Sequence, residues 1–144
     1  MAISRTTKLA FFDTNVLLYL LSLDARKADI AEHLVSLGGA ISVQVLNEFT
    51  QVARRKFKMP ASDVVAVLST LRRTLKVEPL TEATHDLGVA LSAKYSFSVY
   101  DAMIVASGLS CDATTLYSED MQSGLLVERQ LRVQNPFASA FQLP

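Results

Sequence analysis

Two residue types that commonly bind metals are scarce in this chain of 144 residues. Cys111 is the only cysteine, so an intrachain disulfide and a cysteine-based zinc site are both excluded. His33 and His85 are the only histidines, too few for a histidine-rich metal centre. A metal site in this chain would therefore rely on oxygen ligands. With no disulfide to form, a reducing cytoplasm is the expected location.

Long apolar runs and an excess of one charge are also lacking. The longest apolar stretch, residues 16–21, is far short of the roughly 20 residues that span a membrane. Residues 1–8 carry charge, but no apolar segment of the length found in secretion signals follows them. No membrane association is expected. The 14 basic residues balance the 14 acidic ones, so nucleic acid would have to bind at a local patch.

Repeats, low-complexity segments and an internal linker are lacking too, so residues 1–144 are expected to form one domain. Apolar segments bounded by turn residues alternate with segments of helical periodicity. Strands are expected at residues 8–12, 40–43, 77–80, 113–117 and 131–134. Helices are expected at residues 24–37, from 42 or 44 to about 56, and from 62, 81 and 101 onward. This alternation predicts an α/β fold with a mostly parallel sheet covered on both faces.

Four acidic side chains lie where predicted strands end or helices begin. Asp13 follows the first strand, Asp101 opens a helix, and Asp120 comes three positions after the strand that ends at residue 117. Glu48 lies about two turns into its helix, at the edge of the apolar stripe. Because sites in parallel sheets form at the carboxyl ends of strands, the four acids are expected to share one rim. Asp13 is the hardest to explain otherwise, since apolar segments flank it on both sides.

Each acid also has a purely structural explanation. Asp13 and Asp101 suit helix N-termini. Asp120 suits a turn, and Glu48 can pair with Arg55. Clustered together, however, carboxylates repel one another unless they are protonated or neutralised by a cation. A site made only of oxygen atoms suits Mg²⁺ or Mn²⁺, ions that activate water and stabilise charge on a phosphodiester.

Four segments around these acids resemble the motifs of PIN-domain ribonucleases, and most closely the VapC-like toxins of bacterial toxin–antitoxin pairs. They read FDTNVLLY, ISVQVLNEF, YDAMIVA and LYSED, and occupy residues 12–19, 41–49, 100–106 and 116–120. Each motif alone is weak, but together they occur in the family's order over nearly the whole chain. The resemblance implies a three-layer α/β/α fold and an endoribonuclease that depends on Mg²⁺ or Mn²⁺.

The resemblance also assigns roles by position. Asp13 and Asp101 would be the principal metal ligands, Glu48 a ligand or a water-positioning acid, and Asp120 the fourth acid. The polar groups beside these ligands would be Asn15 and Ser118. The implied partners are an RNA substrate, an antitoxin protein that fills the acidic groove, and a second copy of the chain. Many relatives carry an acid or an aromatic residue just after the fourth motif, where this chain has Met121-Gln122, which weakens the inference of a second metal.

Basic and aromatic residues supply candidates for RNA contacts. The densest basic clusters are Arg54, Arg55 and Lys56 with Lys58, and Arg72 and Arg73 with Lys76. They can contact phosphates or simply form solvated helix faces. The aromatic residues near the third motif can stack on bases or pack internally; they are Tyr95, Phe97 and Tyr100.

Three other readings compete. A haloacid dehalogenase-type phosphatase needs a second aspartate at the position of Asn15, and a receiver domain needs a lysine late in the chain, whereas none follows Lys94. The alternative from another class is a degenerate PIN fold that binds RNA or protein without catalysis. Loss of an acid would indicate that alternative, and all four acids are present.

Overall fold

The computed structural model describes residues 8–144, so residues 1–7 of the segment considered above as a secretion signal lie outside the described residues. Six strands form one sheet in the order β3-β2-β1-β4-β6-β5. Their bounds are β1 Ala10–Phe12, β2 Ala40–Ser42, β3 Lys76–Glu78, β4 Thr115–Tyr117, β5 Leu126–Val127 and β6 Leu131–Gln134. All neighbouring strands pair in parallel except β5 and β6, which are antiparallel.

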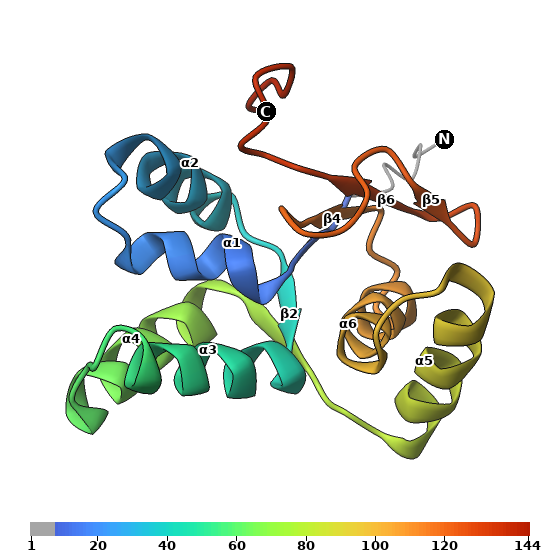
Figure 1. The fold of residues 1–144 in the computed structure, drawn as a ribbon, viewed down its shortest axis with the longest axis horizontal. Helices are drawn as coiled ribbons and strands as arrows, with labels where there is room; N and C mark the ends of the chain where they lie inside the picture. The colour runs from blue at the N-terminus through green and yellow to red at the C-terminus, as the bar shows by residue number, and fades with distance from the viewer. Residues whose placement is uncertain (1–7) are drawn as a thin grey trace, which may run out of the picture.

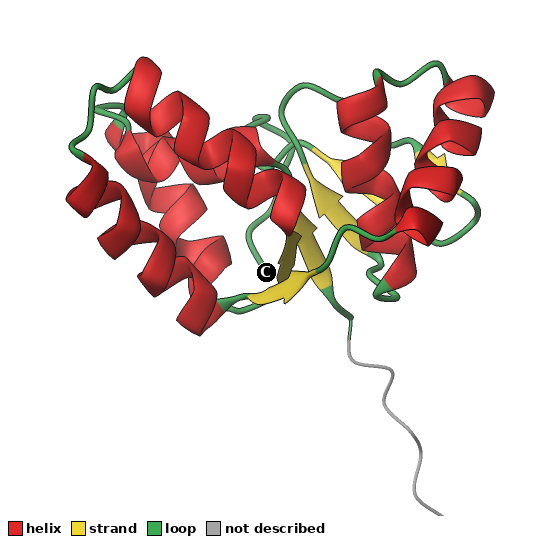
Figure 2. Ribbon diagram, turned by 90° about the horizontal axis from the view of Figure 1, so that it is seen from below, coloured by secondary structure: helices red, strands yellow, loops and turns green. Residues whose placement is uncertain are grey.

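Helices cover both faces of this sheet, which confirms the predicted three-layer α/β/α fold. Their bounds are α1 Thr14–Leu18, α2 Ala25–Ser36, α3 Val43–Arg55, α4 Ala61–Thr74, α5 Glu82–Tyr95 and α6 Val99–Ser110. In Figures 1 and 2, α1 to α4 gather on one side of the strands while α5 and α6 lie together on the other. None of the helices within residues 8–144 is long and apolar enough to cross a membrane.

Polar side chains begin several helices where the sequence predicts them. Asp24 accepts the Lys27 N–H and caps α2, Ser42 caps α3, and Thr81 forms a capping box at α5. The cap of α4 was expected at Ser62 or a nearby residue; it is Pro60, two positions earlier, which provides no side-chain hydrogen bond. The helix begins at Ala61 directly after Pro60, whose fixed φ suits the start of a helix.

One further boundary and two short elements differ from the sequence prediction. The loop expected up to residue 100 ends sooner, because Ser98 accepts the Asp101 N–H and α6 begins at Val99. Asp101 is thus the third residue of α6 and does not open it. The short β5 and a 3-10 helix at Tyr19–Leu21 were not predicted. Both are too short to show a hydrophobic period.

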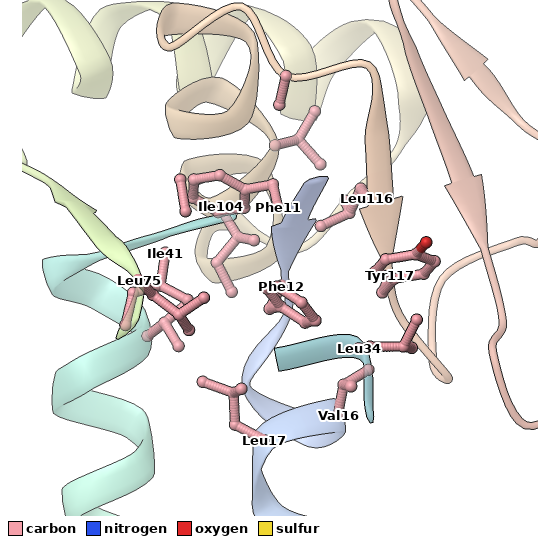
Figure 3. Packing of buried hydrophobic residues seen from close by; sticks show 14 of the residues in the cluster. Phe11, Phe12, Val16, Leu17, Leu34, Ile41, Leu75, Ile104, Leu116 and Tyr117 are labelled. Carbon is pink, nitrogen blue, oxygen red and sulfur yellow. The ribbon is translucent and has the colours of Figure 1, made fainter. Parts of the chain in front are cut away.

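The core lies between the sheet and the two helical layers, around the strand that precedes Asp13. Phe11 and Phe12 of β1 are fully buried, and their side chains lie on opposite faces as neighbouring strand residues must. Figure 3 shows Ile104 and Leu116 among the side chains around them. A sheet buried on both faces explains why the strand reads as a continuous apolar run.

Candidate active site

The register between β1 and β4 brings Asp13 beside Ser118. Phe12 pairs with Tyr117, so the next residue of each strand leaves the sheet at the same level. The Asp13 N–H donates to the Tyr117 carbonyl at 2.9 Å and extends the pairing by one residue. The Ser118 hydroxyl donates to Asp13 Oδ2 at 2.7 Å. Both residues therefore lie at the carboxyl-terminal edge of the sheet.

The Asp13 carboxylate is both a helix cap and a member of a polar cluster. Its Oδ1 accepts the Thr14 N–H at 2.7 Å, so the structural role considered for Asp13 is present. That bond satisfies only one carboxylate oxygen. The Oδ2 atom accepts from Ser118 and, at 3.1 Å, from Asn15 Nδ2. A cap at the start of a five-residue helix does not by itself require this second set of contacts.

Burial makes the charge of Asp13 costly. The residue is 4% exposed, and among the described residues lining the cavity that it faces there is no lysine or arginine. Burial raises the pKa of Asp13 to about 7. Repulsion from Asp101 and Glu48 adds to this rise, while the hydrogen bonds from Ser118 and Thr14 oppose it. The carboxylate therefore has hydrogen-bond donors around it but no cationic side chain in the lining.

Asn15 connects the first and fourth motifs. Its Nδ2 donates to Asp13 Oδ2 and, at 3.0 Å, to Asp120 Oδ2. Its Oδ1 accepts the Glu119 N–H at 3.1 Å. One amide thereby holds two carboxylates near each other although they are more than 100 positions apart in the chain. A second aspartate at this position would add repulsion instead of donors.

Glu48 reaches the same edge of the sheet from α3. Its Oε2 accepts the Thr14 hydroxyl at 2.6 Å, and its Oε1 accepts Gln44 Nε2 at 2.8 Å. Arg55 is not its partner, since Glu48 takes part in none of the ion pairs among residues 8–144. The two bonds hold the carboxylate over the start of α1.

Asp101 approaches from α6, on the other side of the sheet. Burial raises the pKa of Asp101, and the charges of Glu48 and Asp120 raise it further, while a hydrogen bond from Ser98 opposes the rise. The three carboxylates line the same cavity, so their like charges repel one another there. Ser98 is the N-cap of α6, and Asp101 lies in the first turn of that helix, where a carboxylate also gains from the helix dipole.

The four acids line one cavity of about 550 Å³ at the carboxyl ends of the strands. The complete lining is Asp13, Thr14, Asn15, Leu18, Asn47, Glu48, Gln51, Val52, Asp101 and Asp120. The acids nevertheless do not form a tight group. Within residues 8–144, no three acidic, histidine or cysteine side chains are arranged closely enough to hold a metal ion. The four carboxylates repel one another, and in the described part of the chain no lysine or arginine side chain lines the cavity to offset their charge, which favours a spread arrangement.

The donor set fits a hard divalent cation. Carboxylate, amide and hydroxyl oxygens face the cavity, and neither histidine nor cysteine lines it. Mg²⁺ and Mn²⁺ prefer such ligands, and Mg²⁺ typically keeps several waters and uses only one or two carboxylates. A buried Asp13 and a neighbouring Asp101 are therefore compatible with an ion that the other acids contact through water.

A network beside the cavity was not anticipated from the sequence. Tyr19 donates its hydroxyl to Glu119, and Lys27 Nζ donates to Glu119 Oε2 at 2.7 Å and to the Tyr19 hydroxyl at 3.0 Å. Burial and the charge of Asp24 raise the pKa of Glu119, but these bonds and the charge of Lys27 outweigh them, so the pKa is lowered. The network holds the residue that precedes Asp120. The partners lie 92 and 100 positions apart, so no local pattern reveals them.

The predicted RNA contacts are spread over different surfaces. Arg54 and Arg55 occupy the exposed last turn of α3, and Lys56 caps it. Only Lys56 of these three lines a cavity, a second one of about 320 Å³ next to the acidic one. The second basic cluster, with Arg72 and Arg73, is exposed at the end of α4.

The aromatic residues near the third motif differ in their surroundings. Tyr95 and Phe97 stack on each other with ring centroids 5.5 Å apart, which agrees with internal packing. Tyr100 is exposed at the start of α6. Met121, which stands where many relatives have an acid or an aromatic residue, is buried, and its N–H donates to Ser118 Oγ. It contributes no donor to the acidic cavity.

Solved structures with the same fold include toxins and toxin–antitoxin complexes. A toxin–antitoxin complex from Klebsiella pneumoniae matches with a TM-score of 0.68 and 21% identity, covering 89% of this chain and 98% of that one. Mycobacterium tuberculosis VapC20, a sarcin–ricin loop cleaving toxin, matches with a TM-score of 0.63 and 22% identity over 77% and 89% of the two chains. VapBC2 from Rickettsia felis, bound to a promoter DNA fragment, matches with a TM-score of 0.60 and 16% identity, covering 88% of this chain and 99% of that one.

The sequence itself adds an independent comparison. No curated protein gives a significant match. The PIN domain family matches residues 10–122, a segment that contains all four acids and more than half of the chain. The predicted resemblance is thereby confirmed at the level of the family, and this protein belongs to the PIN domain family.

Proposed function

We propose that this protein is an endoribonuclease that depends on Mg²⁺ or Mn²⁺ and hydrolyses RNA phosphodiester bonds. The observation that carries the proposal is the cavity that Asp13, Glu48, Asp101 and Asp120 line together at the carboxyl ends of the strands. A bound divalent ion would activate water and neutralise charge on the phosphodiester. Asp13 and Asp101 would hold it, with Glu48 and Asp120 as further ligands or as contacts through water.

The other residues of the cavity would prepare the acids for this role. Ser118 and Asn15 orient the Asp13 carboxylate through hydrogen bonds, and no lysine or arginine is among the described residues that line the cavity. Thr14 and Gln44 orient Glu48 through both of its oxygens. Such contacts around metal ligands typically change metal affinity or activity by about 10–100-fold when they are removed.

The similarity to VapC20 and to toxin–antitoxin complexes supports an assignment as the toxin of such a pair. We therefore propose an antitoxin protein as partner, a cytoplasmic location and a homodimer. Exposed apolar side chains offer surface for such contacts; they include Leu37, Val65, Val89 and Val99. Sedimentation at micromolar concentration tests the homodimer, and a monomer under these conditions would contradict it.

The deciding experiment measures RNA cleavage by the purified protein with Mn²⁺ or Mg²⁺. Addition of EDTA, Asp13→Asn and Asp101→Asn are each expected to lower the rate by about a thousandfold or more, because several kcal/mol of charge stabilisation are lost. Asp86→Asn is the matched control, since Asp86 is an exposed carboxylate of α5 outside the cavity. It should leave the rate unchanged.

A binding measurement separates catalysis from folding. Mn²⁺ at 100 times its Kd should stabilise the wild type by about 2.7 kcal/mol, with a clearly smaller effect on folded Asp13→Asn protein. Cleavage that survives EDTA or both substitutions would refute the proposal. No cleavage together with no bound cation would instead support the degenerate, non-catalytic PIN fold.

A further inference from the structure

We propose that the second cavity, next to the acidic one, binds the nucleotide of a single-stranded RNA that adjoins the cleaved bond. The ligand would be recognised through its phosphate by Lys56 and through its base by Phe57. This inference rests on the proposed function, because it extends the RNA path beyond the four acids.

The two cavities are continuous in their walls. Asn15, Leu18 and Val52 line both of them. The first cavity has about 550 Å³ and the second about 320 Å³, each within the range of small-ligand pockets. Asn15 stands at the boundary, with its amide bonded to Asp13 and Asp120. An RNA strand that passes from the four acids over Asn15 would therefore enter the second cavity directly.

The second cavity supplies the chemistry that the first one lacks. Carboxylates line the acidic cavity, which repels phosphates unless a cation is bound. Lys56 provides a positive charge in the adjoining wall, and its Nζ lies 5.9 Å from the ring centroid of Phe57. A cation beside an aromatic ring is the combination by which proteins hold single strands without reading sequence.

One aromatic side chain of the second cavity, Tyr19, is held in place by its contacts. Tyr19 contributes to the lining, and its hydroxyl is held by Glu119 and Lys27. Its ring packs edge-on against Phe137 at 4.6 Å between centroids. Ser22 adds a polar side chain to the lining of this cavity. A fixed ring limits the conformational entropy that binding would otherwise cost.

This geometry distinguishes Lys56 from its basic neighbours. Lys56 follows Val52 by four residues, so both lie on the side of α3 that borders the two cavities. Arg54 and Arg55 line neither cavity. If RNA bound to a general basic patch, Arg54, Arg55 and Lys56 would contribute equally to its affinity. An RNA strand that runs through the two cavities contacts Lys56 in preference to the two arginines.

The test measures binding of a fluorescein-labelled, mixed-sequence 12-nucleotide RNA by anisotropy over a series of salt concentrations. The parent protein is Asp101→Asn with Mn²⁺ present, which prevents cleavage during the measurement. Lys56→Gln should weaken binding and reduce the slope of log K against log salt by about 0.7, as expected for one phosphate contact on a single strand. Phe57→Leu should weaken binding about fivefold or more without changing the slope, because it removes stacking and not charge.

Arg129→Gln is the matched control, since it removes one exposed positive charge from the turn between β5 and β6. It should leave affinity and slope unchanged, and Arg54→Gln should change them less than Lys56→Gln. Circular dichroism checks that each variant is folded.

Unchanged RNA affinity in both Lys56→Gln and Phe57→Leu would overturn the proposal and leave this cavity to a protein partner. An equal loss from Arg54→Gln would overturn it in favour of a general basic patch. These outcomes are separate from a failure of the proposed function, which is judged by the metal-dependent cleavage of the wild type.

Discussion

Asp13 and Asp101 face the same cavity, but they are held in different ways. Asp13 follows a central strand, is almost completely buried, and accepts hydrogen bonds from Thr14, Asn15 and Ser118. Asp101 projects from α6, is only partly buried, and is positioned through its helix, whose cap is Ser98. One half of the candidate site is therefore anchored by sheet register and the other by helix packing.

The difference indicates a fixed half and an adaptable half. The Asp13 carboxylate has little freedom, because three donors converge on it in a closed environment. Asp101 and the exposed Asp120 can change rotamer at lower cost. This division is consistent with carboxylates that share a cavity without forming a tight group, since a cation would draw the adaptable acids toward the fixed one.

The largest effect should come from the pH dependence of stability without metal. The pKa of Asp13 is about 7 in the folded protein and 3.8 when unperturbed, so the folded state binds the proton more tightly. Its contribution to stability is fully present below pH 4 and is lost as the pH rises to about 7. At about 1.4 kcal/mol per pKa unit, the loss amounts to a few kcal/mol.

Urea unfolding in EDTA between pH 4 and 8 measures this loss. Asp13→Asn should flatten the profile most, and Asp101→Asn should flatten it less because Asp101 is less buried. Equal flattening by the two variants would contradict the distinction between the fixed and the adaptable half.

A second, smaller effect should separate two serines. Ser118→Ala removes a buried donor to Asp13 and an acceptor for the Met121 N–H. It should lower cleavage by about 10–100-fold and stability by about 1–3 kcal/mol. Ser98→Ala removes the cap of α6 and should cost about 1 kcal/mol of stability, with cleavage within a few-fold of the wild type. The test measures the cleavage rates and urea midpoints of both variants. A larger loss of cleavage in Ser98→Ala than in Ser118→Ala would contradict the prediction.

The smallest effect concerns the loop that carries Asp120. Glu119→Gln weakens the partly exposed pair with Lys27 and should lower stability by about 1 kcal/mol or less, with a smaller difference at high salt. The matched variant is Glu128→Gln, whose pair with Lys94 is more exposed. Thermal unfolding at two salt concentrations should show little change for Glu128→Gln. A change as large as that of Glu119→Gln would mean that the Tyr19 network adds nothing.

Much of the fold was predictable because it depends on local chemistry. Asp24, Ser42 and Thr81 cap helices as their side chains suggest, and the apolar strands of β1 and β2 lie near their expected positions. The strand β5 has only two residues, too few for a hydrophobic period to reveal it in the sequence. Ser98 was passed over as the α6 cap because Asp101, three residues later, is an equally good capping residue by type.

The sequence by itself determined the alternation of strands and helices, the four acids and their order, and the scarcity of histidine and cysteine as metal ligands. Only the tertiary structure decided that Phe12 pairs with Tyr117, which brings Ser118 to Asp13, and that Lys56 rather than Arg54 lines the second cavity, next to the acidic one. The physical reason is the distance along the chain over which each effect acts. Periodicity and capping act within a few residues, whereas strand order and helix packing join groups about 100 positions apart through burial that no local pattern records.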